Sequence, residues 1–254
     1  MRLMESLKYV ICFPFNDKYA KKCLEIEEVI EKILDLEGRK LTLLAKGTDS
    51  IVLSLDEKYA LKVVRLDREI SLLKEGMSLY ILERNFKKTG IKIAPELYSF
   101  SKYHVLMERI NGISISDFIF SASEDELKDA LRSLLIYSLK LDSIRLSHNE
   151  LSRPYHHVFF IKNREKITPI FLDFGSSTIN GNNSNFLQIS SALFLSKSRI
   201  NERITKSFKI DEIKQNKLRE LLILYKNCFK KRCMQEEIEK VIEKILNIIF
   251  RQES

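Results

Sequence analysis

The chain has 254 residues, of which 44% are hydrophobic, and its formal net charge is +8. This length and composition allow a substantial core, which excludes a disordered chain and a small domain that depends on disulfides. The positive charges are interleaved with 35 acidic residues, which indicates a solvated surface more than a dedicated nucleic-acid interface.

The cysteines and the apolar segments indicate the cellular compartment of the protein. The four cysteines form no Cys-x-x-Cys pair, so we expect reduced, packed thiols. The N-terminal stretch has too short an apolar core and too many charges for a signal peptide. No uninterrupted span of about 20 apolar residues occurs that could cross a membrane. We therefore expect a cytoplasmic protein with no membrane partner.

The first 39 residues predict a strand followed by a helix. The apolar stretch 7–15 is typical of a strand, and apolar residues recur at helical spacing from Tyr19 to Glu37. Gly38 is the predicted end of this helix. We expect this β–α extension, residues 1–39, to pack on the region that follows it.

Residues 40–112 predict a β-rich unit with one helix inserted. Three strand-like runs between residues 40 and 64 are joined by short connections, as in an antiparallel meander, and a fourth strand is predicted over 103–110. A helix is predicted from Asp67 to Phe86. Its apolar positions are Ile70, Leu73, Met77, Tyr80 and Ile81.

Residues 113–254 predict a mostly helical unit. Ser123 and Glu126 have the spacing of a capping box at the start of a long amphipathic helix. Two apolar runs, 158–161 and 170–172, predict a small hairpin, and helices are expected from Asn185 onward. The predicted fold class is therefore α+β.

A lysine stands inside the apolar run Tyr59–Val64. A buried ammonium group without a partner is costly, so an inward-facing Lys62 requires an acid. The helix that follows offers Glu69 and Glu75, of which we prefer Glu75. The alternative is an edge-strand lysine that faces water.

Further polar groups occur where the predicted strands and helices end. Asp173-Phe174-Gly175 follows an apolar run, and a carboxylate there can hold magnesium on a nucleotide. His148 and Glu150 lie between the long helix and the hairpin, where a carboxylate can orient an attacking hydroxyl. Taken singly, His148 is more often a packed histidine and Glu150 a surface acid. Gly47 lies in a turn that could cradle phosphates or be a plain hairpin.

The chain resembles the protein-kinase-like superfamily over roughly residues 40 to 190. The resemblance is carried, in order, by Gly47, Lys62, Glu75, Met107-Glu108-Arg109, His148-x-Glu150-Leu151 and Asp173-Phe174-Gly175. It is most similar to atypical RIO-type kinases and to predicted Ser/Thr kinases of archaea. The reason is that only SSTINGNNS separates Gly175 from the next helical run, which leaves no room for a long activation segment.

The resemblance implies a bilobal fold and a role for each matching residue. The N-lobe would be residues 40–112, and the helical C-lobe, residues 113–254, would carry the catalytic loop 148–158. Lys62 would bind the α/β-phosphates of ATP with Glu75 as its ion-pair partner, Asp173 would ligate magnesium, and Glu150 would replace the catalytic aspartate. The implied nucleotide-binding residues are Gly47, Ser50, Val52, Ala60, Lys62, Glu75, Met107 at the back of the adenine pocket, and Glu108 and Ile110 of the hinge.

Two residues depart from the family pattern. Glu150 is one methylene longer than aspartate, and about 1 Å of misplacement can slow a reaction about 100-fold. His157 stands where a metal-binding asparagine is expected, and imidazole is a poorer magnesium ligand than an oxygen. Either Mn²⁺ is preferred to Mg²⁺, or one metal suffices, or nucleotide binds without turnover.

The resemblance implies an ATP-dependent atypical Ser/Thr protein kinase that transfers γ-phosphate to a hydroxyl of a protein substrate or of itself. One alternative is a pseudokinase that serves as a nucleotide-binding scaffold. Another is a small-molecule kinase of the aminoglycoside or choline type, whose catalytic loop also begins His-Asn-acid, although such enzymes usually carry a larger helical insertion. The RIO-type resemblance further implies a ribonucleoprotein partner.

Overall fold

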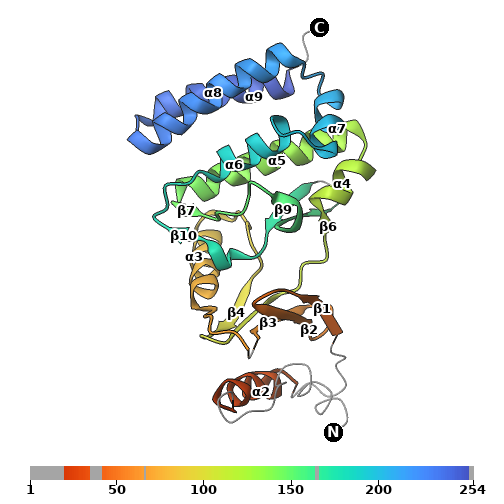
Figure 1. The fold of residues 1–254 in the computed structure, drawn as a ribbon, viewed down its shortest axis with the longest axis vertical. Coiled ribbons are helices and arrows are strands. Elements are labelled where there is room, and N and C mark those ends of the chain that lie inside the picture. The colour runs from red at the N-terminus through yellow and green to blue at the C-terminus, as the bar shows by residue number, and fades with distance from the viewer. Residues whose placement is uncertain (1–19, 35–41, 66, 164–165, 252–254) are drawn as a thin grey trace. The chain divides into compact units, whose positions relative to one another are not determined.

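The computed structural model describes residues 20–34, 42–65, 67–163 and 166–251 (Figure 1). The chain divides after Asn111 into two units. The strand predicted at 7–15 and the helix end predicted at Gly38 lie outside the described residues.

An antiparallel five-stranded sheet forms the first unit, with strand order β1-β2-β3-β5-β4. The predicted meander is confirmed, whereas β4 was not predicted. The strands are β1 (Thr42–Lys46), β2 (Ser50–Ser54), β3 (Tyr59–Val64), β4 (Leu97–Phe100) and β5 (His104–Glu108), and the helices are α2 (Ala20–Leu34) and α3 (Leu73–Thr89).

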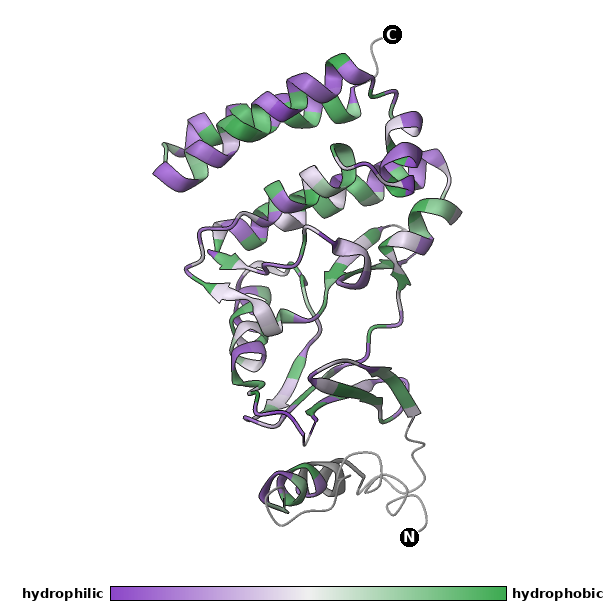
Figure 2. Cartoon of the chain, viewed as in Figure 1, coloured by the Kyte–Doolittle hydropathy of each residue, from purple (hydrophilic) through white to green (hydrophobic). Residues whose placement is uncertain are grey.

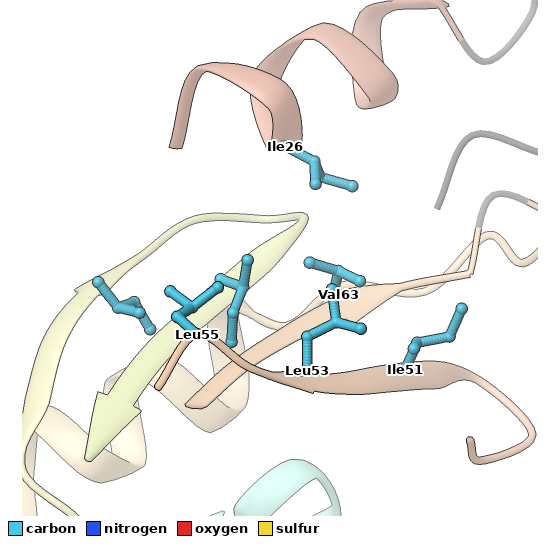
Figure 3. Packing of buried hydrophobic residues seen from close by; sticks show 7 residues of the cluster. Ile26, Ile51, Leu53, Leu55 and Val63 are labelled. Carbon is cyan, nitrogen blue, oxygen red and sulfur yellow. The ribbon is translucent and has the colours of Figure 1, made fainter. Parts of the chain in front are cut away.

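One face of this sheet packs against α2. Ile26 of α2 is completely buried and points toward the β2 and β3 side chains Leu53 and Val63 (Figure 3). A fully buried aliphatic side chain stabilises the fold by roughly 1.5–3 kcal/mol. The cluster consists of Ile26, Ile51, Leu53, Leu55, Leu61, Val63 and Leu106. Cys23 of the same helix is disulfide-bonded, so the expectation of four reduced thiols is wrong for this residue.

The helix α3 corrects the sequence prediction in two respects. It begins at Leu73 rather than at Asp67, because the Leu72 amide donates to the Lys102 carbonyl and not to a carbonyl of a preceding helical turn. Its buried face includes Glu75, Gly76, Ser78, Leu79 and Leu82. The predicted apolar positions Leu73, Met77 and Tyr80 are exposed.

Gly76 explains how α3 comes so close to the sheet. A Cβ atom at this position would lie 2.2 Å from the Phe100 ring in β4. Only a glycine permits this approach. The small residue therefore determines which side of the helix faces the strands.

Buried His104 at the start of β5 makes the stability of this unit depend on pH. Its ring nitrogens bond to the hydroxyls of Ser101 (2.9 Å) and Ser99 (3.3 Å), and burial lowers its pKa below 6.5 although Glu25 lies 3.8 Å away. Because the unfolded chain takes up this proton first, the free energy of unfolding falls as the pH drops below 6.5 toward the folded-state pKa. A His104→Gln variant should lack this part of the decline.

Urea unfolding at about pH 7.5 and about pH 5.5 gives, for each protein, the change in the free energy of unfolding between the two pH values. The contributions of all other titrating groups cancel when the value for His104→Gln is subtracted from the value for the wild type. Equal pH dependence of wild type and His104→Gln would contradict the prediction.

The second unit combines helices with two small sheets (Figure 1). The predicted hairpin is confirmed as β8 and β9. The helices are α4 (Ile115–Ser121), α5 (Glu124–Ser143), α6 (Asn185–Phe194), α7 (Arg199–Ser207), α8 (Glu212–Lys231) and α9 (Gln235–Phe250). The strands are β6 (Ile113–Ser114), β8 (Val158–Lys162) and β9 (Ile167–Phe171) in one sheet, and β7 (Leu146–Ser147) and β10 (Thr178–Ile179) in the other.

The helix α5 is the centre of the second unit. The predicted capping box of Ser123 and Glu126 is present, and Leu127, Leu131 and Leu134 on its inner face are fully buried. Its neighbours are α6 and β9, and α8 and α9 pair with each other (Figure 1). In Figure 2, α8 and α9 each carry both hydrophobic and hydrophilic residues along their length, as amphipathic helices do.

The fold class predicted from the sequence is confirmed by the described residues. They form a mixed α+β structure with an antiparallel, β-rich first unit and a mostly helical second unit. Among these helices none is sufficiently long and apolar to cross a lipid bilayer.

Candidate active site

The first unit contains a buried ion pair between β3 and α3. The Lys62 ammonium lies 2.7 Å from the Glu75 carboxylate, and their side chains are 9% and 1% exposed. β3 lies between β2 and β5, so the alternative of an edge-strand lysine facing water is wrong. Glu75 is the partner that we preferred from the sequence.

Strand registers place several predicted nucleotide-binding residues on the sheet face that carries Lys62. Lys62 is opposite Val52 on β2, and Ala60 is opposite Met107 on β5. Residues directly opposite in neighbouring strands, and residues two apart in one strand, point to the same face. Val52, Ala60, Lys62 and Met107 therefore share a face, and the α2 cluster occupies the other.

The turn between β1 and β2 is a closed hairpin. The Gly47 amide donates to the Ser50 carbonyl at 2.8 Å. This amide is therefore already bonded and does not point outward to a phosphate. Of the two alternatives left open by the sequence, the structure favours the plain hairpin.

Some polar groups of the predicted hinge residues already bond to partners in the first unit. The Glu108 amide donates to the Glu96 carbonyl, and the Glu108 carboxylate pairs with Lys92 at 2.6 Å. The Arg109 amide donates to the Lys58 carbonyl. The Glu108 amide is thus unavailable to a ligand, whereas Ile110 has no backbone partner among the described residues.

In the second unit, Leu172 brings the catalytic loop and Asp173 together. Its amide donates to the His157 carbonyl and its carbonyl accepts from the His148 ring nitrogen Nε2, both at 2.8 Å. The next residue, Asp173, has a left-handed backbone with φ 65°. As a result Glu150, His157 and Asp173 each offer one metal-ligating atom, and these atoms lie within 4.8 Å of one another.

His148 holds this loop in place and takes no proton at neutral pH. Its side chain is fully buried, and burial lowers its pKa to about 4. Its ring packs 4.8 Å from the ring of Phe174, which is also fully buried. The interpretation of His148 as a packed histidine is therefore the one that the structure favours.

Asn149 anchors the segment that follows Asp173-Phe174-Gly175, a role that the sequence did not predict. Its backbone is left-handed, with φ 72°. Its amide donates to the Ser176 carbonyl and the Thr178 hydroxyl, and its side-chain oxygen accepts from Asn183. Together with the pairing of β10 and β7, these bonds fix the segment 176–184 against the catalytic loop.

Asp142 supports the loop from inside the unit. This α5 residue is 5% exposed, and its carboxylate accepts hydrogen bonds from Ser184, Asn185, Phe186 and Tyr225. Burial raises its pKa. Asn185 in turn accepts from the His148 amide and donates to the Leu146 carbonyl, both at 2.8 Å.

A sequence signal for Asp142 existed. It lies seven residues after Leu135, on the same apolar face of the helix, where an acid has to find polar partners. The partners themselves lie 42 to 83 residues further on and carried no such signal.

No protein-family model and no curated protein matches the chain. Among solved structures, it is similar to the aminoglycoside phosphotransferase APH(2'')-Ib bound to ADP, with 16% identity, a TM-score of 0.44, and coverage of 89% of this chain and 99% of that chain. It is also similar to APH(2'')-IIa with streptomycin and ATP (15%, 0.45, 88% and 98%) and with gentamicin (14%, 0.46, 89% and 98%).

Proposed function

We propose that the chain is an ATP-dependent phosphotransferase that transfers γ-phosphate to a hydroxyl group. The observation that carries the proposal is the buried Lys62–Glu75 pair at 2.7 Å on the central strand β3. Apolar residues of similar size often replace a buried ion pair without loss of stability, so we assign this pair to function rather than to stability. A lysine fixed by a glutamate is the cation that holds ATP phosphates in kinases.

The sheet face around Lys62 suits the rest of the nucleotide. Val52, Ala60 and Met107 on that face present an apolar surface to an adenine ring. Ile110 has a backbone amide that can donate to the ring. Ser50, at the start of β2, lies next to the turn that contains Gly47.

The second unit supplies the carboxylates that the reaction requires. Asp173 and His157 would hold a divalent cation, Mg²⁺ or Mn²⁺, and their oxygen and nitrogen donors fit such an ion. When bound, the cation neutralises charge on the phosphates. The Glu150 side chain is 44% exposed, which lets a carboxylate oxygen orient the attacking hydroxyl.

The short segment after Gly175 bears on the acceptor. Residues 176–184 are held against the catalytic loop by backbone pairing and by Asn149. The Ser177 side chain is fully buried, and the Ser176 hydroxyl donates to the His148 carbonyl. Self-phosphorylation of either serine is therefore disfavoured, and so is an extended peptide docked along this segment.

These contacts favour a small hydroxyl compound as the acceptor, which the His148-Asn149-Glu150 order also favours. A protein hydroxyl, as in a Ser/Thr protein kinase, is the second candidate. The RIO-type affiliation, the ribonucleoprotein partner and the cytoplasmic location stay predictions from the sequence.

Transfer of labelled γ-phosphate from ATP tests the proposal. We expect the full chain, with Mg²⁺ or Mn²⁺, to label a compound in a panel of aminoglycosides, amino alcohols and Ser/Thr peptides. Lys62→Ala and Asp173→Ala should reduce transfer by about 100- to 1,000-fold, because each removes a charge that acts on the phosphates. Lys102→Ala, which changes an exposed lysine of the first unit, should retain transfer.

Undiminished transfer in both Lys62→Ala and Asp173→Ala would contradict the proposal. Calorimetric binding of ATP without transfer to any acceptor would instead support the pseudokinase alternative.

A further inference from the structure

We infer that Glu150 is itself a metal ligand and that Glu150, His157 and Asp173 form a site selective for Mn²⁺ and similar transition-metal ions over Mg²⁺. The inference deepens the proposed function, since the cation is the one that would serve the phosphates. It adds a third ligand and a metal preference, and it requires no nucleotide for binding.

The distance between Glu150 and His157 fits one ion shared by these two side chains. Nε2 of His157 lies 3.7 Å from Oε2 of Glu150, which is too long for a hydrogen bond. Two atoms bound to one ion at about 2.1 Å each can be at most about 4.2 Å apart. The 3.7 Å separation therefore leaves room for an ion between these two atoms. Asp173 offers a ligand atom within 4.8 Å of one ligand atom of each of the two residues.

The site is also held ready by the backbone. The His157 carbonyl accepts from the Leu172 amide, and the Leu172 carbonyl accepts from the His148 ring. Asn185 fixes the His148 amide at the start of the loop that carries Glu150. The three ligands come from two loops of one unit, and these bonds set the spacing of those loops.

The types of donor decide which ion the site prefers. Mg²⁺ takes oxygen ligands in near-ideal octahedral geometry and gives up water reluctantly. An imidazole nitrogen is typically a ligand of transition-metal ions, and by the usual order of affinities a site that contains one binds Mn²⁺ less tightly than Co²⁺ or Zn²⁺. The His157 side chain is 16% exposed, so its nitrogen is partly shielded from competing water. Two carboxylates balance the charge of a divalent ion.

Binding of the ion leaves Glu150 its other function. A carboxylate has two oxygens, and the one that lies 3.7 Å from the His157 ring nitrogen is Oε2. Oε1 can still accept a hydrogen bond from an attacking hydroxyl. The extra methylene relative to aspartate is what lets this side chain extend toward His157.

Electron paramagnetic resonance of Mn²⁺ tests the inference on the full chain without nucleotide. We expect the wild type to bind Mn²⁺ at least about tenfold more tightly than Mg²⁺, measured by competition. Pulsed measurements should detect coupling of bound Mn²⁺ to an imidazole nitrogen. His157→Asn should abolish this coupling and weaken Mn²⁺ binding about tenfold, while Mg²⁺ binding changes little.

Two further variants sharpen the test. Glu150→Gln should weaken binding of both ions about tenfold, because it removes a charged ligand. His156→Asn, the exposed neighbour of His157, should bind Mn²⁺ as the wild type does and keep the nitrogen coupling. Circular dichroism of each variant confirms that it is folded.

Absence of nitrogen coupling in the wild type, or equal affinity for Mn²⁺ and Mg²⁺, would overturn the inference even if a variant fails to fold. The proposed function fails separately. A protein that shows the nitrogen coupling but transfers no phosphate keeps the metal site and loses the activity.

Discussion

Replacing Lys62 by methionine should lower the free energy of unfolding by about 3–5 kcal/mol, because it breaks an ion pair whose glutamate is almost completely buried. The double variant Lys62→Met with Glu75→Leu should recover most of this loss. Apolar residues of similar size can replace a buried pair without leaving a charge in the interior. Urea unfolding followed by circular dichroism measures all three proteins.

The control is Lys102→Met, an exposed lysine of the same unit, which should change the free energy of unfolding by no more than about 0.5 kcal/mol. Phosphate transfer should be absent from the double variant even though it is stable. A single Lys62→Met variant as stable as the wild type would show that the pair is not the buried interaction described above.

Asp142→Asn is expected to destabilise the protein by about 3 kcal/mol or more, although it only replaces one carboxylate oxygen by an amide nitrogen. The carboxylate accepts from Ser184, Asn185, Phe186 and Tyr225, and an amide turns one of the two acceptor oxygens into a donor. A buried donor facing other donors costs about 1–3 kcal/mol for each group left unsatisfied. Thermal or urea unfolding measures the loss.

Two variants bracket the effect of Asp142→Asn. Tyr225→Phe removes one of the hydrogen bonds and should cost about 1 kcal/mol. Asp129→Asn, on the exposed side of the same helix, should be nearly neutral.

Hydrogen exchange supplies a local measurement of the same change. The His148 amide donates a hydrogen bond to the Asn185 side chain. Its hydrogen should exchange with solvent faster in Asp142→Asn than in Asp129→Asn. Equal exchange would mean that Asp142 does not position the catalytic loop.

The parts of the fold that depend on local pattern were predictable. The meander, the capping box of Ser123 and the hairpin of β8 and β9 follow from alternation, caps and turns in short stretches of sequence. The buried face of α3 was not predictable in this way. Its apolar residues Met77 and Tyr80 are exposed, because the approach at Gly76 and the ion pair of Glu75 set which side faces the sheet.

The candidate site likewise has features that the sequence could predict and features that it could not. A buried lysine requires an acid, so the pairing of Lys62 with Glu75 could be inferred from the sequence. The support of the loop by Asn149, Asn185 and Asp142 could not. Each of these side chains bonds to groups between 27 and 83 residues away, and amides and carboxylates are too common in loops to show such partners beforehand.

The segment 176–184 has a consequence for how such a protein would be controlled. β10 pairs with β7, Asn183 bonds to Asn149, and the buried Ser177 hydroxyl donates to Phe174. A modifying enzyme could reach Ser177 only after this part of the unit unfolds. Folding itself thus holds this segment in place, so the phosphotransferase proposed above would need no modification of residues 176–184 to reach its active arrangement.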